Sequence, residues 1–461
     1  MSSLCWIRRD LRPHDHVALS HALETGETTL VFVFDTHILN KLSDKHDRRV
    51  TFIYQSLQEM EKILQKHGSS LLIRYGRPEE EIPKLASELK VKNVFCNRDY
   101  EPYAKARDLK VAKKLSHMGI NFEQFKDSVM FEKQEVLTNS FGIYKVFTPY
   151  KNKWLETFEK TGRIVSNYDC PLENLRQFQN KKNILDFDWY KIIGFFNSPP
   201  LLTGGSPAGL CRLKNFNLTI DKYAENRNFP SLSGTSLLSV YLRFGNISVR
   251  NMVQLALDHS SEGSRTWLTE IIWRDFYQMI LDSYPHVEKG AFKREYDQIK
   301  FLGSEKEFNA WKSGQTGFPL IDAAMRCLNE TGMMHNRLRM VVASFLCKTL
   351  LIDWRKGEKY FAQKLLDFDL ASNNGGWQWS ASSGCDSQPY FRIFNPYAQS
   401  EKFDPEGLFI HQWVPELKHL KGKGLHRPDA LLAPDYPRPI VSYELSRSRC
   451  LRMYDVIKIS K

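Results

Sequence analysis

The sequence predicts an α/β domain with a parallel, Rossmann-like sheet, followed by an all-helical domain. In the first 130 residues, short apolar runs alternate with amphipathic helical patterns, whereas beyond residue 206 helical periodicity continues almost to the end. A chain of 461 residues is also too long for one ordinary core. We expect an α/β domain over 1–130, an interdomain linker over 131–205 and a helical domain over 206–461.

Four runs in the first domain predict strands because they are apolar and lack polar alternation, as in a sheet buried on both faces. These runs are 3–7, 29–35, 70–75 and 94–96. Apolar residues at helical spacing predict the helices 17–24, 48–66, 78–90 and 102–117. Neither GxGxxG nor GxxxxGK[ST] occurs, so a standard dinucleotide or nucleoside-triphosphate loop is not expected.

The rest of the chain divides by composition. Residues 131–205 are rich in Asn, Lys and Pro with weak periodicity, which is typical of a connection carrying short helices. Beyond them, helical patterns cover 210–226, 265–283, 319–330 and 334–354, with a Pro-rich tail after Leu425.

Composition narrows the classes of partner and compartment. The net charge of +12 favours a polyanionic partner, although such a surplus also serves solubility. The eight cysteines are scattered without a CxxC pair, so neither a metal site nor a disulfide framework is expected. Arg8, Arg9 and Asp10 follow the N-terminus too closely for a signal peptide, and no apolar run reaches membrane-spanning length. We therefore expect a cytoplasmic protein.

The segment 332–379 collects an unusual set of polar and aromatic groups. It begins in a basic cluster around Asn336 and Arg339, and it ends in two acids, two amides, two glycines and two tryptophans. Arg339 could pair with Asp367 or Asp369. Because glycines allow close approach of a ligand or of backbone, we expect a pocket for a large planar cofactor with polar edges.

Three other stretches carry candidate binding groups. Residues 234–239 place small hydroxyl side chains where a helix could begin, which suits helix capping or an anion site. Glu270 and Arg274 are four residues apart, as in a surface ion pair, yet Trp273 beside them could form an aromatic wall. Arg392, flanked by aromatic residues, could reach a phosphate.

The chain resembles the photolyase–cryptochrome family, most closely the class I DNA photolyases that repair cyclobutane pyrimidine dimers. The resemblance rests on six motifs in family order. They are Trp6-Ile7-Arg8-Arg9-Asp10-Leu11-Arg12, the Gly234-Thr235-Ser236 helix start, Trp267-x-x-Glu270-x-x-Trp273-Arg274, Met334-His335-Asn336-Arg337-Leu338-Arg339-Met340, Asn373-Asn374-Gly375-Gly376-Trp377-Gln378-Trp379 and Tyr390-Phe391-Arg392-Ile393-Phe394-Asn395-Pro396.

The resemblance implies a U-shaped FAD in the helical domain. Its phosphates would lie against residues 235–239, with Tyr223 nearby. Asp367 and Asp369 would hydrogen-bond the flavin and ribityl region, Arg339 would pair with Asp367, and Asn373 would face flavin N5. The set implied for the cofactor is therefore Tyr223, Thr235, Ser236, Leu237, Leu238, Ser239, Arg339, Asp367, Asp369 and Asn373.

The same resemblance implies light-driven electron transfer from excited reduced FAD to the dimer, which leaves the duplex at a cost of a few kcal/mol. Glu270 and Asn336 would hydrogen-bond the pyrimidine edges and Met340 would contact the lesion. Trp273 and Trp379 would form an apolar wall. Arg227, Arg274 and Arg392 would bind backbone phosphates of double- or single-stranded DNA, which the positive charge favours. No metal is implied, and we expect a monomer.

Single positions distinguish the subfamilies of this family and the possible antenna chromophores. (6-4) photolyases have a His pair at His335-Asn336, and plant cryptochromes have Asp at Asn373, so both positions favour dimer repair. A cryptochrome-like photoreceptor without repair activity is the alternative. Tyr103-Ala104 stand where folate-binding relatives have Asn-Glu, which disfavours a folate antenna and leaves a deazaflavin, a flavin mononucleotide or no antenna open.

Photoreduction in the family often passes through three tryptophans. Trp377 and Trp354 match the first two, but the third position is Phe301, which is too hard to oxidise to serve as an ordinary hopping station. We expect slow photoreduction, or an exit through Trp311, Tyr296 or Tyr360.

Overall fold

The computed structural model describes residues 2–163, 165–178 and 188–459, and its contacts divide the chain into two compact units. Unit 1 comprises Met1–Ile143, Lys151–Ile220 and Ser236–Asp282, and unit 2 comprises Tyr144–Tyr150, Asp221–Thr235 and Ser283–Lys461. Residues 236–282 therefore group with the unit that carries the sheet. Part of the expected linker, 164 and 179–187, lies outside the described residues.

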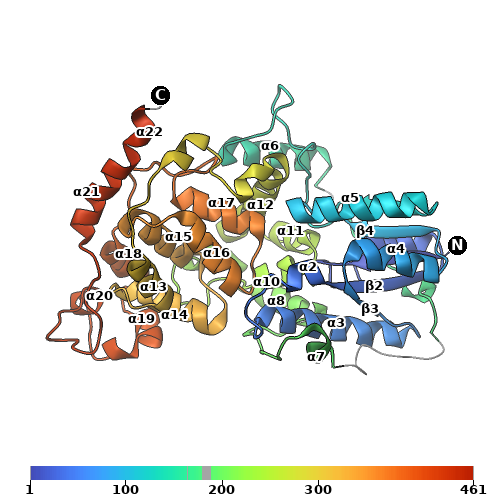
Figure 1. Cartoon of the computed structure of the whole chain (residues 1–461), viewed down its shortest axis with the longest axis horizontal. Helices are drawn as coiled ribbons and strands as arrows, with labels where there is room; N and C mark the ends of the chain where they lie inside the picture. The colour runs from blue at the N-terminus through green and yellow to red at the C-terminus, as the bar shows by residue number, and fades with distance from the viewer. Residues whose placement is uncertain (1, 164, 179–187, 460–461) are drawn as a thin grey trace. The chain divides into compact units, whose positions relative to one another are not determined.

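Unit 1 is built on a five-stranded parallel sheet in the order β3-β2-β1-β4-β5 (Figure 1). The strands are β1 (Ser3–Ile7), β2 (Thr28–Asp35), β3 (Leu72–Gly76), β4 (Asn93–Asn97) and β5 (Asn121–Phe125). The predicted parallel sheet is thus confirmed. Strand β5 was not predicted, because this edge strand alternates exposed polar residues with half-buried ones and has no continuous apolar run.

The helices of the sheet repeat match the predicted ones closely. They are α1 (Val17–Glu24), α3 (Arg48–Lys66), α4 (Pro78–Glu88) and α5 (Pro102–His117), with the short α2 (Thr36–Leu39) after β2. Right-handed crossovers place α1 and α3 on one face, and α4 and α5 on the other. One buried cluster joins α4 and α5 to alternate residues of β1, β2 and β4, so the central strands are covered on both faces.

The remaining elements of unit 1 are helical. They are α6 (Phe147–Lys160, whose first turn belongs to unit 2), η1 (Leu172–Asn174), α7 (Trp189–Ile193), α8 (Ser206–Asn217), α10 (Ser239–Arg243), α11 (Val249–Leu257) and α12 (Glu262–Ser283, whose last residue belongs to unit 2). The predicted helix over 210–226 is broken after α8. There the Thr219 hydroxyl donates to the Phe216 carbonyl at 3.2 Å, and a side chain that bonds the local backbone competes with continued helix.

Buried charges connect α11 to the segments after β1 and β5. Asp127 accepts hydrogen bonds from Arg12 Nη2 and Arg250 Nη2, each at 2.7 Å, and Arg250 Nε donates to Asp15 Oδ1 at 2.8 Å. The four side chains are 1–8% exposed. Burial raises the pKa of Asp127, but the guanidinium groups of Arg12 and Arg250 outweigh burial and hold that pKa below its usual value.

Unit 2 is all-helical in its described residues. Its elements are α9 (Tyr223–Asn226), η4 (Pro285–Glu288), η5 (Arg294–Gln298), α13 (Glu305–Ser313), α14 (Pro319–Thr331), α15 (Asn336–Ser344), η6 (Phe345–Thr349), α16 (Trp354–Lys364), α17 (Leu370–Ser380), α18 (Pro396–Phe403), α19 (Leu408–Trp413), η7 (Pro415–Leu417), α20 (Lys423–His426), α21 (Tyr443–Tyr454) and α22 (Val456–Ile459). η3 (Ile220–Lys222) crosses the boundary between the units. The expected Pro-rich tail after Leu425 therefore carries the two helices α21 and α22.

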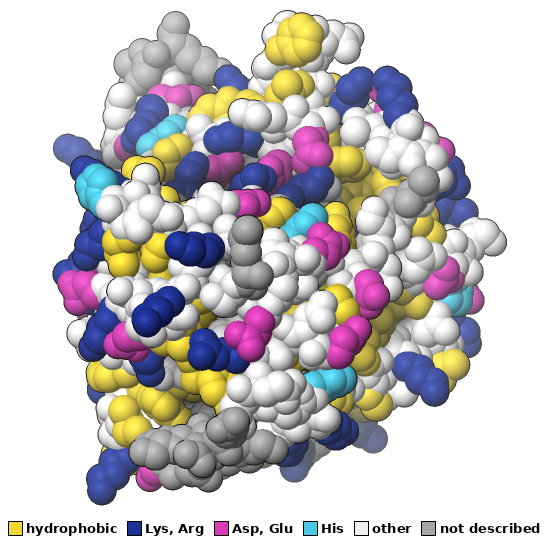
Figure 2. Space-filling model, turned by 90° about the vertical axis from the view of Figure 1, so that its right-hand side faces the viewer, with side chains coloured by type: hydrophobic (Ala, Val, Ile, Leu, Met, Phe, Trp, Pro, Cys, Tyr) yellow, Lys and Arg dark blue, Asp and Glu magenta, His cyan; other side chains and the backbone are white. Residues whose placement is uncertain are grey.

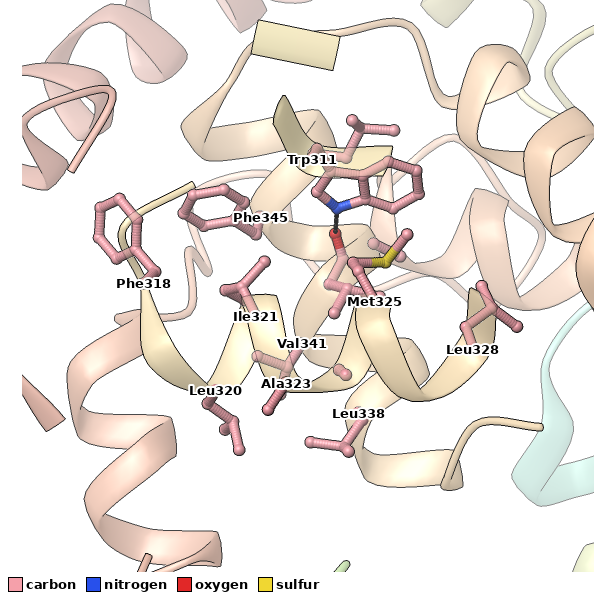
Figure 3. Close-up of a cluster of buried hydrophobic side chains, with 14 of the residues drawn as sticks. Trp311, Phe318, Leu320, Ile321, Ala323, Met325, Leu328, Leu338, Val341 and Phe345 are labelled. Carbon is pink, nitrogen blue, oxygen red and sulfur yellow. Dashed lines mark hydrogen bonds between the residues drawn. The ribbon is translucent and has the colours of Figure 1, made fainter. Parts of the chain in front are cut away.

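The core of unit 2 gathers around α13, α14 and α15 (Figure 3). Trp311 is fully buried there, and its Nε1 donates to the Val342 carbonyl at 3.2 Å. The predicted single helix over 334–354 is wrong, because α15 passes into the π-helical turn η6, and residues 350–353 are not helical before α16 begins at Trp354. Leu351 adopts a left-handed φ of 55°, and Asp353 caps α16 by accepting from Arg355 N at 3.0 Å.

Charges of both signs are mixed on one side of unit 1. Figure 2 shows the side of this unit that carries the sheet, where Lys and Arg are interleaved with Asp and Glu. The surplus of +12 is therefore not gathered on this side into one basic patch.

Among the described residues, no helix has the length and apolarity that crossing a bilayer requires.

We predict that Asp127→Asn lowers the free energy of unfolding by about 3–5 kcal/mol at pH 7, because two buried guanidinium groups lose a shared carboxylate. The folded pKa of Asp127 lies below the unfolded value of about 4, so its contribution is present above that pH and is lost as the pH falls. Urea unfolding at pH 7 and below pH 4 tests this.

The difference between wild type and variant should shrink at the lower pH. Glu156→Gln, which removes an exposed carboxylate paired with Lys153 and Lys160, is the control and should leave stability unchanged. An equal effect of the two substitutions would contradict the prediction.

Candidate functional site

The basic cluster at the start of α15 is organised by a capping histidine. His335 Nδ1 accepts from the Arg337 backbone N–H at 3.2 Å, which requires the ring nitrogen to be unprotonated. Burial, together with Arg337 and Arg339, lowers the pKa of His335 to about 4. Asn336, the first helical residue, is exposed, and Met340 is half-buried one turn later on the same side of the helix.

The predicted pairing of Arg339 with Asp367 is confirmed. Arg339 Nη2 lies 3.0 and 2.9 Å from the two carboxylate oxygens of Asp367, and Arg339 Nε donates to the Met334 carbonyl at 2.8 Å. The Asp367 side chain is only 4% exposed, whereas that of Arg339 is 28% exposed. The pair therefore fixes a buried carboxylate just before α17.

The acids and amides of the second half of the segment lie on and before α17. Asp369 caps this helix by accepting from Ser372 N at 2.9 Å. One turn later, Asn373 Nδ2 donates to Glu358 Oε1 at 2.8 Å and to the Glu358 carbonyl at 3.2 Å. Burial raises the pKa of Glu358, and the Asn373 hydrogen bond opposes this rise. Glu358 was not among the residues predicted for the site.

This arrangement leaves both an acceptor and space on α17. Asn373 is buried, yet its Oδ1 accepts no hydrogen bond from any described residue. A Cβ built on Gly376 would meet no heavy atom within 4 Å. An accessible acceptor on a largely buried side chain, beside open space on the same helix, fits a planar group that carries an N–H donor. In the described part of the chain, no cluster of three or more His, Cys, Asp or Glu is arranged to hold a metal ion.

The aromatic residues form a connected path that differs from the tryptophan triad. The Trp377 ring lies 6.1 Å from that of Trp311, centroid to centroid, and Trp311 lies 5.8 Å from Tyr360. The Tyr360 hydroxyl is 2.5 Å from Asn329 Oδ1. Phe301 packs against apolar clusters of unit 2, as an ordinary core residue does.

Several predicted DNA-contacting residues of unit 2 already have protein contacts. The Arg227 guanidinium stacks over the buried Tyr223 ring at 5.3 Å. Arg392 is exposed, and its backbone carbonyl accepts from the buried Lys348 Nζ at 3.0 Å, so a buried cation fixes the chain at this arginine. Trp379 on α17 is half-buried.

Arg337, which the sequence analysis overlooked, approaches the predicted lesion residue Met340. Arg337 Nη1 lies 3.7 Å from Met340 Sδ, and Arg337 Nη2 donates to Asn228 Oδ1 at 2.7 Å. The basic run 337–339 was the only signal for it.

Helix α12 of unit 1 carries Glu270, Trp273 and Arg274 within little more than one turn. The Trp273 ring packs against Tyr277 at 5.4 Å, and Arg274 Nη1 donates to the Ser128 carbonyl. The Arg274 guanidinium is thereby held at the backbone of the segment that follows β5.

The next residue, Asp275, anchors α12 and was also missed. Its Oδ2 accepts from Trp154 Nε1 and from Met130 N, both at 3.1 Å, and from Phe131 N at 3.4 Å. Burial raises the pKa of Asp275 to about 6.

A helix begins at the end of the segment 234–239, but no hydroxyl side chain of the segment caps it as expected. Helix α10 starts only at Ser239, and its capping residue Leu238 offers no side-chain hydrogen bond. Ser236 Oγ accepts from Leu238 N at 3.3 Å, and Leu237 has a left-handed φ of 54°. The local turn thus uses the hydroxyl that was expected to cap the helix.

Steric crowding explains why position 234 is a glycine. Its added Cβ would lie 2.6 Å from the Asn226 carbonyl oxygen, so only glycine allows the two backbones to approach.

Comparison with known proteins identifies the chain. The family model for DNA photolyase matches residues 3–169, and the model for the FAD binding domain of DNA photolyase matches residues 267–456. A deoxyribodipyrimidine photo-lyase of Synechococcus is 38% identical over 99% of this chain and 96% of its own length.

Solved structures agree. A class III photolyase from Agrobacterium tumefaciens is 34% identical with a TM-score of 0.88, covering 99% of this chain and 98% of its own. A cryptochrome from Synechocystis is 30% identical with a TM-score of 0.84, covering 98% and 99%. The predicted family, enzyme type and FAD cofactor are therefore confirmed, and the chain belongs to the DNA photolyase family.

Proposed function

We propose that this protein repairs cyclobutane pyrimidine dimers in ultraviolet-damaged DNA under blue light. The observation that carries the proposal is the arrangement of polar groups on α17 and on the segment just before it. A buried Asp367 is neutralised by Arg339, and one turn into the helix Asn373 holds an unused acceptor beside open space. The name of the Synechococcus relative supports the same reaction.

Candidate ligands for FAD occur in each unit. In unit 2, Asp367 and Asp369 would accept hydrogen bonds from the flavin and ribityl region, and Tyr223 and Thr235 would lie near the phosphates. In unit 1, residues 236–239 would face the phosphates with backbone N–H groups and hydroxyls. When bound, FAD supplies the photochemistry that opens the cyclobutane ring.

The chain's own groups then orient and tune this cofactor. Asn373 would present Oδ1 to the N–H at flavin N5, because its Nδ2 is held by Glu358. Glu358 thereby fixes which end of the amide faces the cofactor. The Arg339–Asp367 pair would hold its carboxylate in one position, since Arg339 is anchored a second time at the Met334 carbonyl.

For the lesion, we propose hydrogen bonds to the pyrimidine edges from Asn336 in unit 2 and from Glu270 in unit 1. Met340 would contact the dimer, and Trp379 and Trp273 would provide apolar walls. Arg227, Arg274 and Arg392 are the proposed phosphate ligands, with Arg392 best placed because its side chain is exposed. A poorly stacked dimer leaves the duplex at low cost.

Cryptochrome-like signalling without repair is the second candidate, favoured by the likeness to the Synechocystis cryptochrome. His335-Asn336 and Asn373 weigh against it, as argued from the sequence. Repair of an irradiated oligonucleotide separates the two functions.

We infer that residues 103–104 disfavour an antenna of the folate type. The Tyr103 hydroxyl donates to Asp35 Oδ2 at 2.7 Å, and its ring stacks on His37 at 4.3 Å. The position therefore lacks a free carboxylate. We propose that the second chromophore, where there is one, is not a folate. We also propose that the protein is a monomer located in the cytoplasm.

We predict that FAD-loaded protein regenerates thymine absorbance from ultraviolet-irradiated oligo-thymidylate under blue light and reductant. Glu270→Ala should weaken binding of this substrate about tenfold with FAD retained, because one hydrogen bond to a buried polar edge is lost. Binding is measured by titration in the dark.

The control is Glu262→Ala, the same charge change two turns earlier on α12, which should have no effect. Unchanged absorbance with the loaded wild type would refute repair, and loss of FAD from Glu270→Ala would refute the role given to Glu270.

We predict that Phe301→Trp accelerates photoreduction of bound FAD, since it restores an oxidisable ring at the third position. In the wild type, Trp311→Phe should slow photoreduction, because it interrupts the path from Trp377 to Tyr360. Absorbance changes under blue light with excess thiol measure both rates. Trp413→Phe is the control, and an unchanged rate in Phe301→Trp would count against the prediction.

We predict that Glu358→Ala shortens FAD retention several-fold, because Asn373 loses a hydrogen bond worth about 1 kcal/mol. Glu358→Gln keeps an acceptor and should retain FAD like the wild type. Flavin fluorescence released over time gives the dissociation rate, with Lys359→Ala as an exposed control on the same helix. Equal retention in Ala and Gln variants would show that Glu358 does not orient Asn373.

A further inference from the structure

A surface hollow of about 510 Å³ lies in unit 2 between α21, the start of α22 and the chain from the end of η5 to Leu302. Helices α21 and α22 are red in Figure 1. The volume falls in the range of small-molecule sites. The lining residues come from two chain segments: Gln298, Lys300, Leu302, Arg449, Arg452, Met453 and Val456.

The hollow is strongly basic. Three of its lining residues are cationic, and none of the seven is acidic. Arg449 and Arg452 are three residues apart on α21 and so lie on the same side of the helix. Lys300 approaches from the other segment. Within the described part of the chain, none of these three cations forms an ion pair or a side-chain hydrogen bond.

Its remaining wall is apolar. Met453 is buried and belongs to a cluster with Ile299, Cys450 and Tyr454 beneath the hollow. Leu302, in contrast, is 56% exposed at the rim. An apolar side chain left open beside three unpaired cations suits a ligand with both an anionic and an apolar part.

We propose that this hollow binds a small organic molecule carrying a phosphate group, of mononucleotide size. Two guanidinium groups and an ammonium match the charge and the several acceptor oxygens of a phosphate. The Met453, Val456 and Leu302 side chains would cover the flat organic body. A bare inorganic anion would leave the apolar wall unused, and a purely apolar ligand would leave the cations unpaired.

The recognised chemistry is the phosphate with its attached organic body, which a free mononucleotide or a nucleotide of a DNA strand could each supply. The proposal is independent of dimer repair, because it uses neither the FAD residues nor the proposed lesion residues. The test uses FAD-loaded protein, because bound FAD prevents a nucleotide probe from binding at the FAD site.

The test is calorimetric titration with adenosine monophosphate, with adenosine, and with an undamaged single-stranded oligonucleotide. The double variant Arg449→Gln/Arg452→Gln removes the paired guanidinium groups, and Lys300→Gln is an independent variant. Arg447→Gln, an exposed arginine of α21 outside the hollow, is the matched control. Thermal unfolding verifies that each variant is folded.

Adenosine monophosphate should bind the wild type with a dissociation constant below 1 mM, about tenfold tighter than it binds the double variant. Adenosine should bind much more weakly. If only the oligonucleotide binds, and binding falls in the double variant but not in Arg447→Gln, the strand is the source of the phosphate. The proposal is overturned if neither adenosine monophosphate nor the oligonucleotide binds. It is also overturned if the probe that binds has the same affinity for the double variant and for Arg447→Gln.

Discussion

The buried cluster of Arg12, Arg250, Asp15 and Asp127 is the interaction on which unit 1 depends. It joins the chain just after β1 to the chain after β5 and to α11, which are separated by more than a hundred residues in sequence. Removing these charges from water is costly, and only mutual pairing in good geometry offsets that cost. Each arginine also donates to the Asp15 carbonyl, so the cluster fixes backbone as well as side chains.

This attachment explains why residues 236–282 group with the sheet although their sequence is helical. Arg250 lies on α11, and α12 follows directly with Asp275 as its second buried anchor. Because the three hydrogen bonds to Asp275 Oδ2 include two backbone N–H groups of 130–131, α12 cannot slide or rotate without breaking them. The proposed lesion residues Glu270 and Trp273 therefore sit on a helix whose register in unit 1 is set by buried charge.

Much of the architecture could be predicted because periodicity reports burial, as β2 and α3 show with nearly the expected bounds. The sequence pattern left Asp367 and Asp369 open as partners of Arg339, and the family resemblance named Asp367, which is the residue that Arg339 contacts. The break at Leu351 was not, because a left-handed residue and a π-helical turn leave the apolar pattern intact. Glu358 was missed for a related reason: its role depends on two helices meeting, which no local pattern records.

That meeting rests on one glycine. A Cβ on Gly357 would lie 2.2 Å from the Trp377 ring and 2.5 Å from Leu346, so α16 and α17 can pack this closely only because the side chain is absent. The same approach brings the neighbouring Glu358 to Asn373. A glycine inside a helix costs about 1 kcal/mol, and here it places the ring proposed for electron supply and the amide proposed for flavin N5 against one helix. The two roles proposed for Asn373 and Trp377 would therefore both depend on the packing of α16 against α17.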